Sequence, residues 1–446
     1  MNLVFGLVID RIYFATQTKH RKVIMQTNFI GDKHIEASYK NSEKRPPILN
    51  MADGEILAQM PRMDWDRPPW NRWSFQRIRS LMPTAQVWRG NGKIMPIPRQ
   101  EKDISHIEFT RSNKVSQTIE MFLDDTYTDG FLVMTDGYIV HESYHNGMRP
   151  ETPHLMQSVS KSITATVTGI MIGRGELDPS ALVKTYMPEL AETAWAGATL
   201  QQVLDMTTGV QYSEEYTRLD SDVGKTDVAS GWRPIAPDAS PDIDWPASVW
   251  DQILSLKTCD ADHGSRFLYR SIETDLLAHV MMRVSGLPLH KLISRELWQP
   301  MGAEEDGYFT VDVRGYGLAS GGFNGCLRDF GRFGQLYLDD GMRHDKQIIP
   351  KDWIADVRRG EHGLWSEERR KLLPNGCYRN QFWIEDETKE SFMCLGVFGQ
   401  LIYIAPAYNM VVVKLSTWPD FLDDDFKVDT QLAIHAIAAE LGKHVD

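Results

Sequence analysis

The chain has 446 residues, which is long enough for a large core and for more than one structural lobe. Its apolar content of 42% and charged content of 24% are typical of a globular protein. The formal net charge is −13 and no long basic cluster occurs, which argues against nucleic acids and anionic membrane surfaces as partners.

The four cysteines are widely spaced and form no C-x-x-C pair. The sequence therefore indicates neither a zinc site nor a disulfide framework, and a reducing compartment fits this usage. The cysteine usage therefore leads us to expect a cytoplasmic protein, and no apolar stretch reaches the length needed to span a bilayer. The sequence leaves the oligomeric state open, with a homodimer among the alternatives.

Residues 1–60 differ from the rest of the chain in their residue pattern, and they include K-N-S-E-K-R-P-P before Met51. We interpret them as an N-terminal extension, either a disordered tail or the product of a start codon assigned too early. The main domain is then expected at 61–446. Its sheet lobe would combine 61–190 with 306–446, and a helical and loop-rich lobe would cover 191–305.

The first clear elements precede residue 210. Residues 130–145 predict a β-hairpin, because two β-rich runs flank the turn signal T-D-G at 135–137. A proline-containing connector then leads into an apolar helix that should end near Gly173. A second helical pattern, L-Q-Q-V-L-D-M, stops before Gly209.

Residues 210–250 are rich in Asp, Pro, Ser and Trp and predict a long irregular loop. Residues 266–286 then predict a short strand and a helix, with Ser271 as its N-cap and Gly286 at its end. L-I-Y-I-A-P and M-V-V-V-K-L-S predict two strands, and a last amphipathic helix covers about 429–441.

This order of elements predicts an α+β fold. An antiparallel sheet is assembled from both ends of the chain, helices lie on its faces, and the middle of the chain forms a mostly helical lobe. A cleft between two lobes is a usual place for a small-molecule site.

Ser158-Val159-Ser160-Lys161 is the only S-x-x-K in the chain. Chance alone gives roughly one such match in a chain of this length, so the spacing by itself is a weak signal. Its context adds weight, because a serine at the start of a helix lies where a developing oxyanion is favoured. Lys161 could act as the base if burial lowers its pKa. The alternative, which the motif alone favours, is a capping serine beside a solvent-exposed lysine.

Other catalytic signatures are absent or in the wrong context. G-x-S-x-G does not occur, which argues against an α/β-hydrolase. H-E-x-x-H occurs once, at 141–145, but within the predicted β-hairpin and not on a helix, so it does not indicate a metallohydrolase. Phosphate-binding and dinucleotide-binding glycine motifs are missing as well. We expect no metal and no organic cofactor.

S-x-x-K at a helix start, then Y-x-[NS], then a glycine-containing C-terminal strand resembles the layout of serine β-lactamases and penicillin-binding proteins. The chain is most similar to the 6-aminohexanoate-dimer (nylon-oligomer) hydrolases, through P-P-W-N-R-W, T-Y-T-D-G-F-L-V, S-V-S-K-S, V-L-D-M, A-S-G-W-R, L-Y-R-S, F-G-Q and V-K-L-S-T-W-P-D. The matches run from about residue 66 to the C-terminus.

The resemblance implies a β-lactamase/transpeptidase-like fold and a serine hydrolase. Such an enzyme would act through a covalent acyl-enzyme on amide or ester bonds of small molecules. A carboxylesterase on the same fold and a non-catalytic binding or sensor protein are the alternatives.

The resemblance also implies a role for individual residues. Ser158 would be the nucleophile, Lys161 its base, and Tyr269 a second acid/base whose proton a nearby ammonium loosens. The backbone N–H groups of Ser158 and Val397 would bind the oxyanion. The residues implied on the substrate side are Tyr216, which would close over the amide, Asp227, which would meet a substrate amine, and Ser320. A solvated loop position is an equally good interpretation of Asp227.

Two other Y-x-N triplets occur, at 144–146 and 378–380, and we interpret their tyrosines as aromatic residues of surface loops. The chain also departs from its relatives at two places. Cys394-Leu395-Gly396 replaces the K-T-G of β-lactamases, and Phe398 replaces the histidine of the H-G-Q triplet of the dimer hydrolases. Both changes remove polar groups, so we expect turnover of small esters and linear amides and little action on penicillins.

Overall fold

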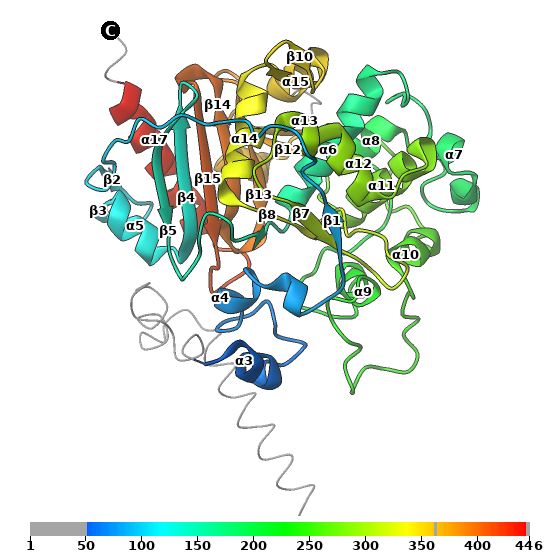
Figure 1. Ribbon diagram of the computed structural model, residues 1–446. Helices are drawn as coiled ribbons and strands as arrows, with labels where there is room; N and C mark the ends of the chain where they lie inside the picture. The colour runs from blue at the N-terminus through cyan, green and yellow to red at the C-terminus, as the bar shows by residue number, and fades with distance from the viewer. Residues whose placement is uncertain (1–50, 361–363, 443–446) are drawn as a thin grey trace, which may run out of the picture.

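The structure is a computed structural model that describes residues 51–360 and 364–442 (Figure 1). Its largest element is an antiparallel sheet of seven strands. In spatial order these are β11 (Cys377–Arg379), β12 (Phe382–Asp386), β13 (Ser391–Gly396), β14 (Gln400–Ala405), β15 (Met410–Ser416), β4 (Thr128–Thr135) and β5 (Tyr138–Tyr144). The C-terminal strand β15 pairs with β4, which confirms the predicted sheet built from two distant parts of the chain.

Both faces of this sheet are buried, because side chains of one strand alternate between two helical layers. Phe131 and Val133 of β4 pack in a cluster with α17 (Asp424–Leu441) and α5 (Ile119–Asp125). Leu132 and Met134 pack in the main core with α14 (Leu327–Leu338). Figure 1 shows the sheet edge-on, with α17 on the outer side and α14 on the inner side.

A second antiparallel sheet joins the lobes, and two hairpins complete the strands of the described chain. The second sheet has the order β1 (Thr84–Val87), β7 (Gly307–Thr310), β8 (Phe323–Gly325) and β6 (His154–Leu155). The hairpins are β2 (Glu108–Thr110) with β3 (Ser116–Thr118), and β9 (Met342–Arg343) with β10 (Lys346–Gln347).

The remaining helices form most of the second lobe and the base of the molecule (Figure 1). They are α3 (Asp53–Gln59), α4 (Asn71–Ser74), α6 (Val159–Gly173), α7 (Val183–Tyr186), α8 (Leu200–Leu204), α9 (Asp222–Ala229), α10 (Val249–Ser255), α11 (Ser271–Ser285), α12 (Leu289–Ile293), α13 (Gln299–Met301), α15 (Lys351–Arg359) and α16 (Glu367–Leu372). Short helical turns are η2 (Ile78–Ser80), η3 (Pro188–Glu192), η4 (Ser294–Trp298), η5 (Val397–Gly399) and η6 (Pro406–Tyr408).

Four local predictions are wrong. The expected loop at 210–250 contains α9, whose N-cap Ser221 accepts a hydrogen bond from the Gly224 N–H. Residues 266–270 form no strand, and Ser271 is the first residue of α11 rather than its cap. The last helix begins at Asp424, because Asp423 caps it, and not near residue 429. Elsewhere the predicted hairpin, α6, the two C-terminal strands and the left-handed Gly286 stop are confirmed.

The helical lobe and the sheet share one hydrophobic core, which includes residues of α6, α8, α11, α14 and the central strands. Residues 1–50 of the expected extension lie outside the described residues. Residues 51–60 contain α3, where Ile56 and Met60 are buried against this core and Asp53 accepts a hydrogen bond from the Trp73 indole.

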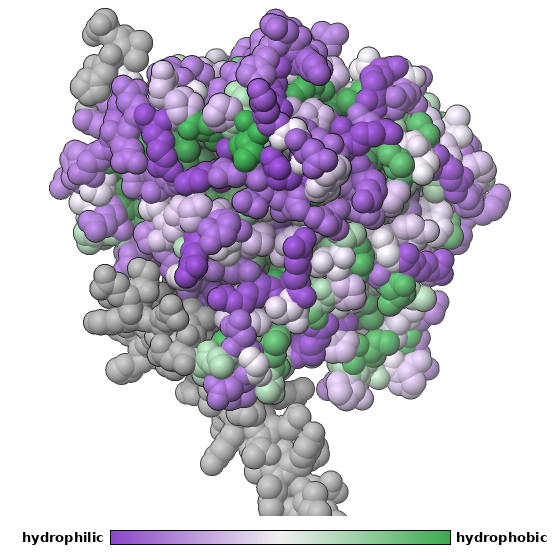
Figure 2. All heavy atoms as spheres, in the orientation of Figure 1, coloured by the Kyte–Doolittle hydropathy of each residue, from purple (hydrophilic) through white to green (hydrophobic). Residues whose placement is uncertain are grey.

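The surface of the described chain is mainly polar on the face that Figure 2 shows, with apolar side chains scattered between charged ones. No described helix is both long and apolar enough to cross a bilayer. All four cysteines are free thiols, and only Cys259 is exposed.

Candidate active site

Ser158 lies at the N-terminus of α6, and two residues separate it from strand β6. The preceding residue, Gln157, has φ +49°, a left-handed conformation that costs energy for a residue with a Cβ atom. Ser158 occupies the N-cap position, but its side chain makes no capping hydrogen bond. The hydroxyl is therefore directed to other partners, and the interpretation as a capped surface turn is wrong.

Lys161 is the partner of that hydroxyl. Its Nζ donates to Ser158 Oγ at 2.8 Å and to the Ser320 carbonyl at 2.7 Å, and the residue is only 2% exposed. Burial lowers the pKa of Lys161 to about 8, although the negative charges of Glu214 and Asp275 act in the opposite direction. A lysine with this pKa is partly neutral near physiological pH and can accept a proton.

Tyr269 reaches the same point from the irregular segment before α11. Its ring stacks on Trp383 with a centroid distance of 5.6 Å, and Lys161 Nζ lies 5.1 Å from the ring centroid. Burial raises the pKa of Tyr269, and a hydrogen bond with the Ser158 side chain only partly opposes this. The expectation that the nearby lysine loosens the phenol proton is therefore wrong: burial dominates, and the neutral phenol is the stable form.

The turn after β13 approaches the nucleophile closely. A Cβ atom on Gly396 would lie 2.5 Å from the Met156 carbonyl oxygen and 3.1 Å from Gln157 Cβ. Only a glycine lets this strand end lie against the residues just before Ser158. Val397 follows at once, and its neighbours Phe398 and Gly399 have φ of 61° and 86°, which turn the chain back into β14.

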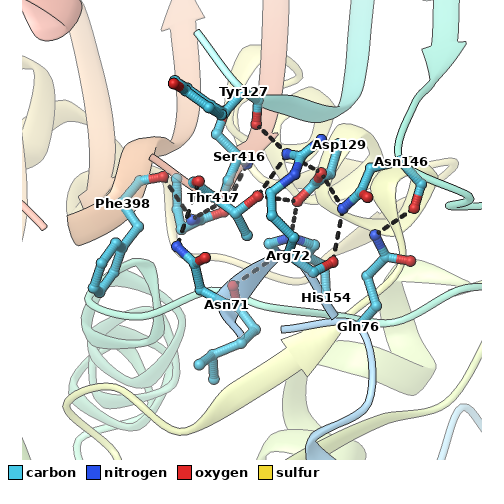
Figure 3. A network of polar contacts seen from close by, with 12 residues as sticks. Asn71, Arg72, Gln76, Tyr127, Asp129, Asn146, His154, Phe398, Ser416 and Thr417 are labelled. Atoms are coloured by element: carbon cyan, nitrogen blue, oxygen red, sulfur yellow. Dashed lines mark hydrogen bonds and ion pairs between the residues drawn. The ribbon is translucent and has the colours of Figure 1, made fainter. Parts of the chain in front are cut away.

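A buried polar network supports this turn from behind (Figure 3). The Gln400 amide donates to the Phe398 carbonyl at 3.2 Å and to the Ser416 carbonyl at 2.6 Å. The Asn71 side chain donates to the Trp418 carbonyl at 3.0 Å. The turn is thus tied both to β15 and to α4, a helix that comes from far away in the sequence.

Arg72 and Asp129 lie at the centre of the same network (Figure 3). Arg72 Nη1 donates to Asp129 Oδ1 and to Thr417 Oγ1, both at 2.7 Å, and His154 Nε2 lies 3.0 Å from Asp129 Oδ2. Burial raises the pKa of Asp129, but the Arg72 charge and hydrogen bonds from His154 and Asn146 outweigh it and hold that pKa below its usual value.

One cavity of about 330 Å³ contains Ser158, Tyr269 and Val397 in its wall. Most of its other lining side chains are apolar, among them Leu373, Trp383, Met393, Leu395, Trp418 and Phe421. The charged side chains in the wall are Arg369, Asp424 and Lys427. An apolar cavity with few polar groups around a nucleophile is the usual form of a small-molecule site.

The three residues predicted on the substrate side lie in different places. Tyr216 lines the cavity, packs on Phe421 at 5.5 Å between centroids, and donates to Glu214 Oε1 at 2.6 Å. Ser320 is buried outside the wall of the cavity and contributes its backbone carbonyl to Lys161.

Asp227 is also outside the wall of the cavity. Its carboxylate pairs with Arg233 at 3.1 Å, and Arg233 pairs with Asp66 at 2.5 Å as well. Asp227 is therefore neither a solvated loop residue nor a residue that faces the cavity with an open carboxylate. Burial raises its pKa to about 6 despite the Arg233 charge.

The sequence analysis missed Asp275. Its Oδ1 accepts from the Ser320 N–H at 3.2 Å, and the Ser320 carbonyl in turn holds Lys161. Burial raises the pKa of Asp275 to about 7. An acid within the apolar run S-I-E-T-D-L-L-A of a predicted helix is the signal that could have indicated it.

Glu214 and Arg369 were missed as well. Glu214 accepts from the Ser271 N–H at 3.0 Å and thereby caps α11, next to Tyr269. Arg369 comes from α16. Nothing in the local sequence marks either residue, because each meets the site only through tertiary folding.

The two other Y-x-N triplets were misread. Tyr378 is fully buried in β11 and packs edge-on against Tyr269 at 6.1 Å, so it is part of the aromatic wall behind the site. Tyr144 lies in β5 and donates to Glu142. Neither is an aromatic residue of a surface loop.

An antiparallel sheet between helical layers, with a buried lysine one turn after a serine at a helix start, defines the class of serine hydrolases with the β-lactamase fold. The beta-lactamase family profile matches residues 115–437. The chain belongs to the beta-lactamase family.

Comparisons with individual proteins show which members of this family the chain resembles. The chain is 34% identical over 367 residues to a 6-aminohexanoate-dimer hydrolase of Paenarthrobacter ureafaciens, which covers 81% of this chain and 90% of that protein. A Bacillus anthracis structure, provisionally assigned as a 6-aminohexanoate-dimer hydrolase, aligns with a TM-score of 0.79 and 28% identity, over 86% of this chain and 98% of that one.

EstCE1, a hydrolase with promiscuous acyltransferase activity, shares the fold at a TM-score of 0.55 and 16% identity, over 71% of this chain and 96% of that one. Together with the family match, the two more similar proteins identify the chain as a serine hydrolase that acts on amide or ester bonds.

Proposed function

We propose that the chain hydrolyses amide bonds of small linear molecules through an acyl-enzyme on Ser158, and that it also accepts simple esters. The observation that carries this proposal is the 2.8 Å contact between Lys161 Nζ and Ser158 Oγ, made by a buried lysine with a lowered pKa. The relative from Paenarthrobacter ureafaciens is described as acting on 6-aminohexanoate dimer, so this dimer is the first substrate to test.

In the proposed acylation step, neutral Lys161 takes the proton of Ser158 while Oγ attacks the substrate carbonyl carbon. The backbone N–H groups of Ser158 and Val397 stabilise the oxyanion. When the C–N bond breaks, the leaving nitrogen takes the Tyr269 proton, and the Lys161 ammonium 5.1 Å from that ring is the source that restores it.

In the proposed second step, water attacks the acyl carbon and the same groups act in reverse. Water loses a proton to the Lys161–Tyr269 pair, the oxyanion forms again between the two N–H groups, and Ser158 leaves as the hydroxyl. The products are a carboxylic acid and the free enzyme. The positions of these groups support this order of reaction steps. No step requires a residue from outside the cavity wall and its buried neighbours.

The test is replacement of the nucleophile. Ser158→Ala should abolish turnover and labelling by a fluorophosphonate probe, and Ser162→Ala is the matched control. Ser162 lies one turn further along α6, where its hydroxyl donates to the Gln381 carbonyl and not to the site. Substantial activity or labelling in Ser158→Ala would disprove the assignment. Absence of labelling in the native chain would favour a non-catalytic binding protein.

Penicillins should be poor substrates. In place of K-T-G, Cys394 is buried and Leu395 and Gly396 border the cavity, so this strand offers neither a cation nor a hydroxyl to a β-lactam carboxylate. Arg270 does not replace them, since it is fully buried and paired with Glu273 at 3.3 Å. Nitrocefin should therefore have a lower kcat/KM than nitrophenyl butyrate. The opposite order would contradict this part of the proposal.

Two further properties belong to the proposal. A cytoplasmic location is supported by the free thiols, three of which are buried, because such cysteines persist most readily in a reducing compartment. Cell fractionation tests this. The oligomeric state, for which a homodimer is one alternative, is tested by light scattering of the purified chain.

A further inference from the structure

The second oxyanion donor of the proposed reaction lies in a strained turn. Val397 is the first residue of η5, and the first N–H of a helical turn has no partner inside that turn, so it can point to a ligand. The next residue, Phe398, has φ 61° and ψ 19°. This left-handed conformation costs energy for a residue with a Cβ atom, and it persists only where the surrounding structure holds it. The groups that hold Phe398 therefore decide where the Val397 N–H points.

Two backbone hydrogen bonds hold Phe398 against the segment that follows β15. Its N–H donates to the Phe421 carbonyl at 2.9 Å, and its carbonyl accepts from the Trp418 N–H at 3.3 Å. Both partners lie in residues 417–423, which form neither a helix nor a strand. These two bonds alone do not fix the turn to the sheet.

The side chain of Gln400 makes the connection to the sheet. It is 1% exposed, and its amide nitrogen lies 3.4 Å from the Val397 carbonyl oxygen, 3.2 Å from that of Phe398 and 2.6 Å from that of Ser416. Its amide oxygen accepts from the Ser416 N–H at 3.2 Å. An amide has two N–H donors and one carbonyl acceptor, so backbone groups of the turn and of β15 occupy both ends of this side chain.

Ser416 is a firm anchor for that side chain. It is the last residue of β15 and is fully buried, and its hydroxyl accepts from Lys414 Nζ. The same ammonium group donates to the Thr126 carbonyl at 3.3 Å. Since β15 lies between β14 and β4, Gln400 ties the strained turn to a central strand of the sheet.

From these contacts we infer that Gln400 is a positioning residue, which holds the Val397 N–H toward the carbonyl oxygen of the substrate. The inference rests on the proposed function, because that function gives Val397 its role as an oxyanion donor. Gln400 acts through the backbone of the turn and not on the reacting atoms, since backbone partners occupy its amide. Without this side chain the turn can relax from its left-handed conformation, and the donor moves away from the oxyanion.

The test compares nitrophenyl butyrate with nitrophenyl thionobutyrate, in which sulfur replaces the carbonyl oxygen. Sulfur is a weak hydrogen-bond acceptor, so the thiono ester gains much less from the two N–H groups. Gln400→Met keeps the length of the side chain and removes its hydrogen bonds. We expect it to lower kcat for the oxygen ester by about tenfold to a hundredfold with little change in KM, because the oxyanion forms only as the reaction proceeds. The preference of the native chain for oxygen over sulfur should shrink by about the same factor.

Gln400→Glu is the second variant, since it keeps the acceptor for the Ser416 N–H and loses the amide donors. It should reduce the preference as well. Gln76→Met is the matched control. This glutamine is also buried, donates to the Asn146 carbonyl at 3.3 Å, and lies at the opposite end of the network from Phe398 (Figure 3). The control should keep the native preference for oxygen even where it lowers the melting temperature.

The preference is a ratio within each variant, so a general loss of active protein does not imitate the effect. An unchanged preference in either folded Gln400 variant, or an equal loss in Gln76→Met, would overturn the inference. If circular dichroism shows that neither Gln400 variant folds, Gln400 serves stability alone and the inference fails as well.

The proposed function is judged separately from this inference. Ester turnover and fluorophosphonate labelling that disappear in Ser158→Ala support the proposed function whatever the Gln400 variants do. A native chain that cleaves neither ester and takes up no probe would disprove both.

Discussion

Lys161 links burial of a single side chain to the pH dependence of the reaction. It is a base only when neutral, and burial lowers its pKa to about 8 from the ordinary 10.5. Below pH 8 the ammonium dominates and cannot take the Ser158 proton. We therefore expect kcat/KM for a neutral ester to rise with pH and to reach half its plateau near pH 8. A profile that is flat between pH 6 and pH 9 would contradict this role.

Asp275 provides an independent check on the same residue. Its negative charge favours the Lys161 ammonium, and Asn would keep an acceptor for the Ser320 N–H. We expect Asp275→Asn to lower the pKa of Lys161 further, so the rising limb of the pH profile should move to lower pH. A limb that moves upward, or stays in place while the protein remains folded, would show that Asp275 does not act on Lys161.

At the scale of elements, the contact between β13 and the start of α6 determines the geometry of the oxyanion site. Gly396 is the point of closest approach, and its neighbour across the gap is a backbone carbonyl that cannot rotate away. We expect Gly396→Ala to push Val397 away from Ser158 and to lower kcat about a hundredfold, the usual effect of a displacement near 1 Å. Steady-state kinetics with nitrophenyl butyrate measures this.

The control for that variant is Gly92→Ala. Gly92 lies in an exposed loop, and a Cβ atom there would meet nothing within 4 Å. It should leave both kcat and the melting temperature unchanged. Equal effects of the two substitutions would show that the loss at Gly396 is a general consequence of adding a methyl group.

At the scale of the whole molecule, the Arg72–Asp129 pair ties α4 to the central sheet. Both side chains are almost fully buried, so removal of Arg72 leaves an uncompensated charge. We expect Arg72→Met to lower the free energy of unfolding by about 3–5 kcal/mol, measured by urea denaturation. Because the pKa of Asp129 is held low, its contribution is complete above the unfolded-state pKa and is lost as pH falls through the folded-state pKa. Asp129→Asn should therefore weaken acid destabilisation.

The N-terminal boundary can be tested by two truncations. Deletion of residues 1–60 removes α3 and exposes the apolar groups that pack on Ile56 and Met60, each worth about 1.5–3 kcal/mol when fully buried. We expect it to lower the melting temperature clearly below that of a chain without residues 1–50. Equal melting temperatures would place the boundary of the folded domain at residue 61, as the sequence suggested.

The sequence alone determined the protein family. It also determined those helices and strands whose signals are local. The T-D-G turn, the apolar run of α6 and the two C-terminal strands are properties of a few neighbouring residues, and Ser158, Lys161, Tyr269 and Tyr216 followed from motifs that resemble known hydrolases. Segments dominated by polar residues were less predictable: α9 forms because tertiary contacts stabilise a helix whose own apolar pattern is weak.

Only the tertiary structure decided the charge state of the site and which residues line its cavity. The lowered pKa of Lys161 depends on burial against residues that are distant in the sequence, such as Tyr269 and Ser320, and no local pattern reports burial. Asp227 looked like a substrate residue until folding brought Arg233 and Asp66 to it. Arg369 reaches the cavity from more than two hundred residues after Ser158, because Phe267, Trp365 and Trp383 meet there and hold its guanidinium in place.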